Sequence, residues 1–185
     1  SLFTLFFFPV LLPGFPYHRF DRALPAPLRR RLLAFYKGCI QRHQYAHRSG
    51  ARYLSKNPSA TSRIASLLET FPGARFVYLY REPVETVPST LRWFSFAMHY
   101  FSSAPERYPL REFVLEATME WYRYPLELAG TAAADSILFV SYDDLVNDPV
   151  ATVGRIYDWL GEDIDAGFAG SLGRGAEEAR LHRPD

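Results

Sequence analysis

Ala74–Trp93 reads Ala-Arg-Phe-Val-Tyr-Leu-Tyr-Arg-Glu-Pro-Val-Glu-Thr-Val-Pro-Ser-Thr-Leu-Arg-Trp, and this stretch decides the fold that the sequence predicts. Its first half is a run of β-branched and aromatic residues, which is typical of a strand buried on both faces. Its second half opens at Pro83, a residue that suits the first turn of a helix because its missing N–H is no loss there. The stretch therefore predicts a strand followed at once by a helix.

Arg81 lies at the junction of this strand and helix. Open α/β sheets bind ligands at the carboxyl ends of their strands, and a helix N-terminus next to an arginine attracts anions. Ser89 follows two helical turns later and offers a hydroxyl donor. We therefore expect an anion site at this junction, for a phosphate group.

Two more strands are predicted, one on each side of the central stretch. Ala51–Ser55 is a short strand that the helix Ser62–Thr70 connects to the central strand, which makes a βαβ unit with a right-handed crossover. Ile137–Ser141 is another continuous apolar strand. Longer helices are predicted over residues 27–48, 83–100, 110–130 and 149–160, with no regular pattern from residue 162 onward.

Each predicted strand ends in a polar residue: Lys56, Arg81 and Tyr142. Parallel strands end at one rim of a sheet, so these side chains should gather there. They would supply a point charge, a fork that fits phosphate and an aromatic ring that can stack on a base. Taken singly, each also fits an ordinary role as a solvated lysine, an arginine paired with a nearby acid or a packed tyrosine. The prediction depends on the three occurring together.

The charge of the chain is nearly balanced in total but not along its length. Its 185 residues carry a net charge of +1, which argues against a general nucleic-acid binder. Residues 1–64 hold eleven Lys/Arg and one acidic residue, Asp21, whereas the remainder is acidic. Either the two parts face each other, or the basic part lines an anionic ligand site or a membrane surface.

The N-terminal part of the sequence gives indications about membrane contact and cellular compartment. The apolar run Leu2–Leu12 is too short to span a bilayer, but with the basic helix from Pro27 it suits peripheral membrane contact as well as core packing. A single cysteine, Cys39, excludes an internal disulfide and favours a reducing, cytoplasmic setting. We expect residues 1–26 to form an irregular apolar, proline-rich arm of a single domain over residues 1–185.

The motifs, taken in order, resemble those of the sulfotransferase superfamily, in its broad bacterial and eukaryotic branch. They are Lys56-Asn57-Pro58, the run Phe71–Val77, Arg81-Glu82-Pro83 with Ser89, the run Val140–Leu145, Asp148-Pro149 and the run Ile156–Gly161. This resemblance implies a P-loop NTPase-like three-layer α/β fold with a parallel sheet. It also implies transfer of a sulfuryl group from 3′-phosphoadenosine-5′-phosphosulfate to a hydroxyl or amine of a small-molecule or glycan acceptor, without a metal.

The resemblance also implies roles for four residues. Arg81 and Ser89 would hold the 3′-phosphate of the donor, Lys56 would face its sulfate or bridging oxygen, and Tyr142 would touch the adenine. The product would be 3′-phosphoadenosine 5′-phosphate. Arg174 and the basic residues after it would close over the 3′-phosphate, unless they form a solvated tail.

Two parts of the family pattern are absent. The glycine-rich loop that holds the 5′-phosphosulfate does not occur in this sequence, so we expect the N-terminal strand and loop to lie upstream and the isolated chain to be inactive. Pro58 occupies the position of the histidine base of cytosolic members, which leaves His43, His47 and His99 as candidates. The alternatives are a non-catalytic nucleotide-binding remnant and a kinase-like P-loop phosphotransferase, which would have a Walker loop upstream.

Overall fold

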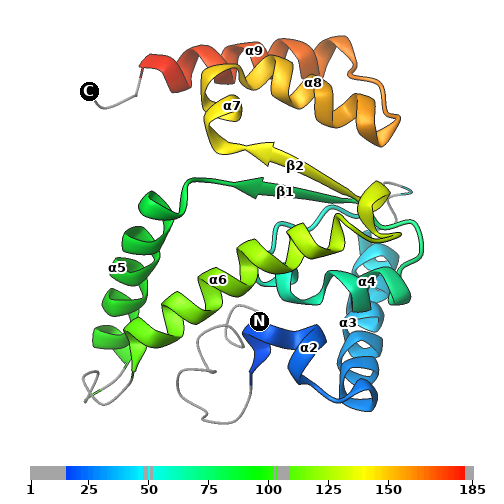
Figure 1. Cartoon of the computed structure of the whole chain (residues 1–185). Helices are drawn as coiled ribbons and strands as arrows, with labels where there is room; N and C mark the ends of the chain where they lie inside the picture. The colour runs from blue at the N-terminus through cyan, green and yellow to red at the C-terminus, as the bar shows by residue number, and fades with distance from the viewer. Residues whose placement is uncertain (1–15, 48–49, 51, 102, 104–108, 182–185) are drawn as a thin grey trace. The chain divides into compact units, whose positions relative to one another are not determined.

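The structure, a computed structural model, describes residues 16–47, 50, 52–101, 103 and 109–181 (Figure 1). The chain divides into two compact units. The helical unit contains Ser1–Ala74 and Pro83–Ala134, and the strand unit contains Arg75–Glu82 and Asp135–Asp185. The chain therefore passes from the helical unit to the strand unit, back again, and then to the strand unit a second time.

The helical unit is built on α5 (Pro83–Phe101) and α6 (Leu110–Leu128), which pack against each other. Phe94 of α5 and Val114 of α6 are buried, and Phe94 meets Phe113 edge-on with ring centroids 5.9 Å apart. The apolar side of α6 is buried or half-buried at Phe113, Val114, Ala117, Trp121 and Tyr124. The other elements of this unit are η1 (Tyr17–Arg19), α2 (Phe20–Ala23), α3 (Ala26–His47), η2 (Pro58–Arg63) and α4 (Ile64–Thr70).

The strand unit is built on two parallel strands, β1 (Phe76–Tyr80) and β2 (Ile137–Ser141). The register pairs Phe76 with Ile137 and Tyr80 with Ser141, so the two strands end level with each other. After β2 the chain continues into α7 (Tyr142–Asn147), α8 (Pro149–Leu160) and α9 (Ala166–Leu181), which are labelled in Figure 1. The short turn η4 (Ala134–Ser136) leads into β2.

Helix α8 shows how local sequence sets the boundaries of an element. The side chain of Asp148 accepts a hydrogen bond from Ala151 N at 3.0 Å and so caps the first turn, which Pro149 opens. Gly161 ends the helix with φ of 69°, a left-handed conformation that glycine adopts without a steric penalty. The predicted helix over residues 149–160 is confirmed at both ends.

The predicted strand Ala51–Ser55 is wrong over residues 52–55, which the structure shows without regular secondary structure. A strand needs a hydrogen-bonded neighbour, and among the described residues β1 and β2 pair only with each other. The side chain of Leu54 is 92% exposed, so no core holds this segment either. Consequently Lys56 does not follow a strand, and the predicted βαβ unit lacks its first strand.

The central strand forms as predicted, but it is not buried on both faces. Val77 is 42% exposed and Leu79 is 47% exposed, whereas Val140 of β2 is fully buried. Both strands have one paired edge in the part of the chain that the structure describes, so the difference lies in how far the described elements cover the side chains of β1 and of β2. An apolar run predicts a strand, but burial of both faces also requires helices or other elements that cover each face of the sheet.

Two segments are more regular than predicted. Helix α9 lies where no pattern was expected, and the side chain of Asp165 caps it by accepting a hydrogen bond from Phe168 N at 2.8 Å. The described end of the predicted irregular arm contains η1 and α2, and Phe20 and Leu24 are buried there. Residues 1–15 lie outside the described part of the chain. In α3, Leu33 is buried whereas Phe35 is exposed.

The described residues thus form an α/β protein that is mostly helical and has a small parallel sheet. The P-loop-type arrangement stays a prediction. Within the described ranges, none of the helices combines the length and the apolar character needed to cross a membrane.

Candidate functional site

Arg81 and Tyr142 lie side by side at the carboxyl ends of the two strands. The guanidinium carbon of Arg81 stands 4.7 Å from the centroid of the Tyr142 ring. Both residues belong to the strand unit, and each directly follows the last paired residue of its strand, Tyr80 or Ser141. Arg81 is exposed and Tyr142 is half-buried, so a ligand from solvent can reach the pair.

Local sequence fixes the chain on both sides of this pair. After Arg81, α5 starts at Pro83, as the sequence predicts. After β2, the Ser141 side chain accepts a hydrogen bond from Asp143 N at 3.2 Å and caps α7, whose first residue is Tyr142. Arg155 of α8 donates to Asp144 of α7 at 3.4 Å. The ring therefore sits at a defined helix start and not in a loose loop.

A similar pair of an arginine and an aromatic ring occurs at the opposite end of β1. The Arg75 guanidinium lies 5.2 Å from the Trp159 ring and donates to the carbonyl oxygen of Asp135 at 2.5 Å. Arg75 precedes β1, so it lies at the amino ends of the strands, where ligands of open α/β sheets do not bind. We interpret this pair as structural, and it serves below as a control for Arg81.

Lys56 and Ser89, the other two predicted site residues, belong to the helical unit. Lys56 is exposed and precedes η2, which is capped by the Asn57 side chain through a hydrogen bond from Ser59 N at 3.1 Å. Ser89 is exposed on α5 and follows Pro88, the proline inside that helix. Of the four predicted residues, the structure thus brings Arg81 and Tyr142 together and presents the other two on the surface of the helical unit.

The candidate bases and the basic tail have local contacts. The rings of His43 and His47, one turn apart on α3, lie tilted at 53° to each other with centroids 4.3 Å apart. The ring of His99 lies with Nδ1 2.8 Å from the carbonyl oxygen of Ser95, one turn earlier. Arg174 donates to Ser171 within α9 at 3.1 Å. None of these contacts selects one histidine as the base. The remaining basic residues of the tail lie outside the side chains that the structure describes.

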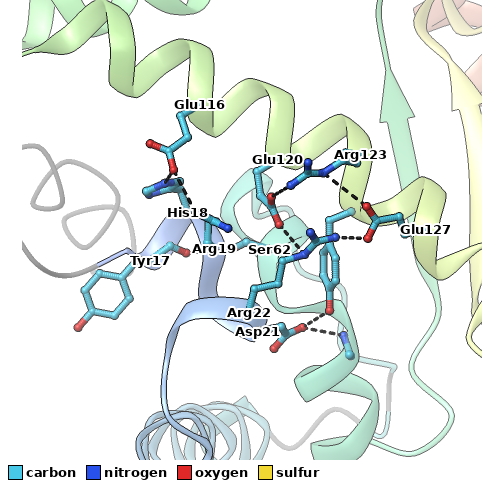
Figure 2. Close-up of polar contacts among 12 residues, drawn as sticks. Tyr17, His18, Arg19, Asp21, Arg22, Ser62, Glu116, Glu120, Arg123 and Glu127 are labelled. Carbon is cyan, nitrogen blue, oxygen red and sulfur yellow. Dashed lines mark hydrogen bonds and ion pairs between the residues drawn. The ribbon is translucent and has the colours of Figure 1, made fainter.

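The sequence analysis missed a polar cluster in the helical unit, centred on Asp21 (Figure 2). Its carboxylate accepts hydrogen bonds from Ala65 N at 3.0 Å and Ser66 N at 3.3 Å, and so caps α4 from a distant part of the chain. The hydroxyls of Ser66 and Tyr124 also donate to it, the latter at 2.6 Å. Asp21 therefore ties α2, α4 and α6 together.

Ion pairs extend this cluster along α6 (Figure 2). The Glu120 carboxylate is 3% exposed and is matched by Arg22 at 2.9 Å and Arg123 at 3.1 Å. Arg22 also pairs with Glu127, and its guanidinium lies 5.1 Å from the Tyr124 ring. A buried carboxylate with two cationic partners is stable only while they remain in place, which makes the cluster a structural element of the unit.

The cluster also alters proton affinities. Burial, followed by the hydrogen bond to Asp21, raises the pKa of the Tyr124 phenol well above its usual value. Burial lowers the pKa of Arg63, whereas the nearby Asp21 carboxylate raises it in part. One signal in the sequence was available, because Asp21 is the single acidic residue among the first 64.

Comparison with known protein families gives a match that includes residues of both units. A model of the sulfotransferase family matches residues 16–166, which include all four predicted site residues. The chain belongs to the sulfotransferase family. No solved structure matches this chain.

Two curated relatives in the sulfotransferase family are similar to part of the chain. Both are omega-hydroxy-beta-dihydromenaquinone-9 sulfotransferases named Stf3, from Mycobacterium bovis and Mycobacterium tuberculosis, and each is 33% identical over 110 residues. The similar stretch covers 57% of this chain and 28% of each relative. The chain therefore corresponds to a minor part of the length of the sulfotransferases it resembles.

Proposed function

We propose that this chain is the part of a sulfotransferase that binds the 3′-phosphate end of 3′-phosphoadenosine-5′-phosphosulfate. The observation that carries the proposal is the Arg81–Tyr142 pair at the level ends of two parallel strands. Its chemistry fits the donor, because a guanidinium binds a phosphate dianion bidentately and an aromatic ring offers a surface for a base. Membership of the sulfotransferase family supports the same assignment.

In this proposal the four residues act on different parts of the donor. Arg81 donates N–H groups to the 3′-phosphate, and the hydroxyl of Ser89 adds a donor to the same group. Tyr142 lies on the adenine side. Lys56 stabilises the negative charge that grows on the leaving phosphate oxygen. The bound donor would supply the sulfuryl group: the acceptor oxygen bonds to sulfur as the bond from sulfur to the phosphate oxygen breaks and 3′-phosphoadenosine 5′-phosphate leaves. The acceptor hydroxyl gives its proton to a general base, for which His43, His47 and His99 are the candidates.

The acceptor in this proposal is a small molecule that carries a hydroxyl group. This choice is suggested by the names of the two relatives, which give omega-hydroxy-beta-dihydromenaquinone-9 as the acceptor. That compound is the first acceptor to test with labelled donor, and a sugar hydroxyl is the second. The donor-binding part of the proposal does not depend on which acceptor is used.

Nucleotide binding tests the proposal directly. Thermal unfolding of the purified protein should shift upward with 3′-phosphoadenosine 5′-phosphate and much less with adenosine 5′-phosphate or ATP. Arg81→Ala should remove the shift, because the guanidinium is the main partner of the 3′-phosphate. Arg75→Ala is the matched control, since it removes the same side chain from the amino end of β1, and it should keep the shift.

The same experiment separates the alternatives. Equal stabilisation by ATP and by the 3′-phosphorylated nucleotide would refute the assignment of Arg81 and favour a phosphotransferase. The gene upstream of Ser1 separates the remaining pair: a Gly-x-x-Arg-Ser-Gly-Thr loop there would support the transferase, and a gene without that loop or a Walker loop would favour a nucleotide-binding remnant.

A further inference from the structure

The strand register itself places the Arg81 and Tyr142 side chains together. Tyr80 and Ser141 are the last paired residues of β1 and β2, so Arg81 and Tyr142 leave adjacent strands at the same level. From this shared level the guanidinium carbon of Arg81 reaches to 4.7 Å from the centroid of the Tyr142 ring. The register thus brings the two residues within reach of each other, and the side chain of Arg81 completes the contact.

Contact with the ring is compatible with anion binding by Arg81 where the guanidinium lies over the ring face. A guanidinium that lies over an aromatic face uses its own face for the contact. Its N–H donors point outward in the plane of the group, where a phosphate can accept two of them. An exposed arginine without such a partner samples many rotamers, most of which direct the donors elsewhere.

We propose that Tyr142 is a positioning residue that sets the selectivity for a 3′-phosphorylated nucleotide by holding Arg81 across its ring. This inference rests on the proposed function, in which Arg81 binds the 3′-phosphate. In addition to any contact with the adenine, the Tyr142 ring then contributes to binding of the 3′-phosphate through Arg81.

The two roles of the ring make different predictions. A ring that only stacks on adenine contributes equally to 3′-phosphoadenosine 5′-phosphate and to adenosine 5′-phosphate, since both contain the base. A ring that positions Arg81 contributes only to the nucleotide with the 3′-phosphate. The ratio of the two dissociation constants therefore isolates the positioning role.

The test measures both dissociation constants by titration calorimetry for the protein and its variants. Tyr142→Phe keeps the ring and should keep the ratio. Tyr142→Leu should reduce the preference for the 3′-phosphorylated nucleotide by about threefold, the size expected for a cation–π contact at an exposed site. Its affinity for adenosine 5′-phosphate should change less than the affinity for the 3′-phosphorylated nucleotide.

Two further variants guard against a trivial loss of structure. Trp159→Leu disrupts the equivalent contact of Arg75 at the other end of the strands and should leave the ratio unchanged. In an Arg81→Ala background, Tyr142→Leu should have no additional effect on the ratio, because the ring then has no guanidinium to hold. Circular dichroism establishes that each variant is folded.

The outcomes separate this inference from the proposed function. If the unmodified protein does not prefer the 3′-phosphorylated nucleotide, the proposed function and the inference both fail. If the preference exists and Tyr142→Leu weakens both nucleotides equally or neither, the proposed function stands and the positioning role is overturned. A change in the ratio that persists in the Arg81→Ala background also overturns it.

Discussion

Replacing Asp21 by alanine should destabilise the helical unit strongly. The Asp21 carboxylate accepts hydrogen bonds from two backbone N–H groups at the start of α4 and from two side-chain hydroxyls. Both hydroxyls belong to buried residues, since Ser66 is 4% exposed and Tyr124 is 7% exposed. Alanine provides no acceptor for any of these four donors, and water has little access to the hydroxyls.

The magnitude follows from these contacts. A buried donor that loses its partner costs about 1–3 kcal/mol, and loss of a helix cap costs about 1 kcal/mol. With two buried hydroxyls at the lower end of that range and one cap, Asp21→Ala should cost about 3 kcal/mol or more. That is a large share of the roughly 5–15 kcal/mol that holds a typical domain folded.

Urea unfolding followed by circular dichroism measures this cost from the transition midpoint and slope. Asp21→Asn keeps one acceptor oxygen and should cost less than Asp21→Ala. Tyr124→Phe removes a single donor and should cost about 1 kcal/mol. A loss below about 1 kcal/mol for Asp21→Ala would refute the interpretation of the carboxylate as the shared acceptor of four buried or helix-terminal donors.

Two other predictions concern alkaline stability and the end of α8. The pKa of Tyr124 is raised above 10.0 in the folded protein, so the unfolded chain ionises first as the pH rises. The contribution of Tyr124 to the free energy of unfolding is therefore complete below pH 10 and declines above it, by about 1.4 kcal/mol per pH unit. Urea titrations at pH 9 to 11 should show that the free energy of unfolding falls less steeply with pH in Tyr124→Phe than in the unmodified protein. Equal slopes in the two proteins would contradict the raised pKa. Gly161→Ala should destabilise the protein by about 1 kcal/mol because of the positive φ alone. Gly154→Ala, inside α8 with open space around it, should stabilise the protein by about 0.5–1 kcal/mol. Thermal unfolding compares the two variants, and a stabilising Gly161→Ala would be inconsistent with the left-handed end of the helix.

The sequence predicted well those elements whose signals are local. Helix α8 carries its cap, its first-turn proline and its terminal glycine within its own residues, and its predicted bounds agree with the structure. Strand β2 is likewise a short apolar run whose bounds agree. The juxtaposition of Arg81 and Tyr142 was also within reach, because it follows from two parallel strands that end in these residues.

The predictions that were wrong depended on partners that a local pattern does not contain. Residues 52–55 have a strand-like composition, but a strand exists only where a neighbour accepts and donates its backbone hydrogen bonds. Helix α9 was missed because its glycines lower helix propensity, while the contact of Phe168 with Tyr157 of α8, at 5.4 Å between ring centroids, stabilises it from outside. The prediction that Lys56 follows a strand was wrong for the same reason, because residues 52–55 form no strand.

The hydrogen bond from Tyr124 to Asp21 has a consequence for synthesis of the protein. It joins residues 103 positions apart, so its donor leaves the ribosome long after its acceptor. At usual translation speeds the delay is about 5–20 s. During that time η1 has no α6 to contact, and the Asp21 carboxylate lacks the Tyr124 hydroxyl as a donor. The turns η1 and α2 are therefore made well before the helix that fastens them, and chaperones that bind apolar segments have that interval in which to act on them.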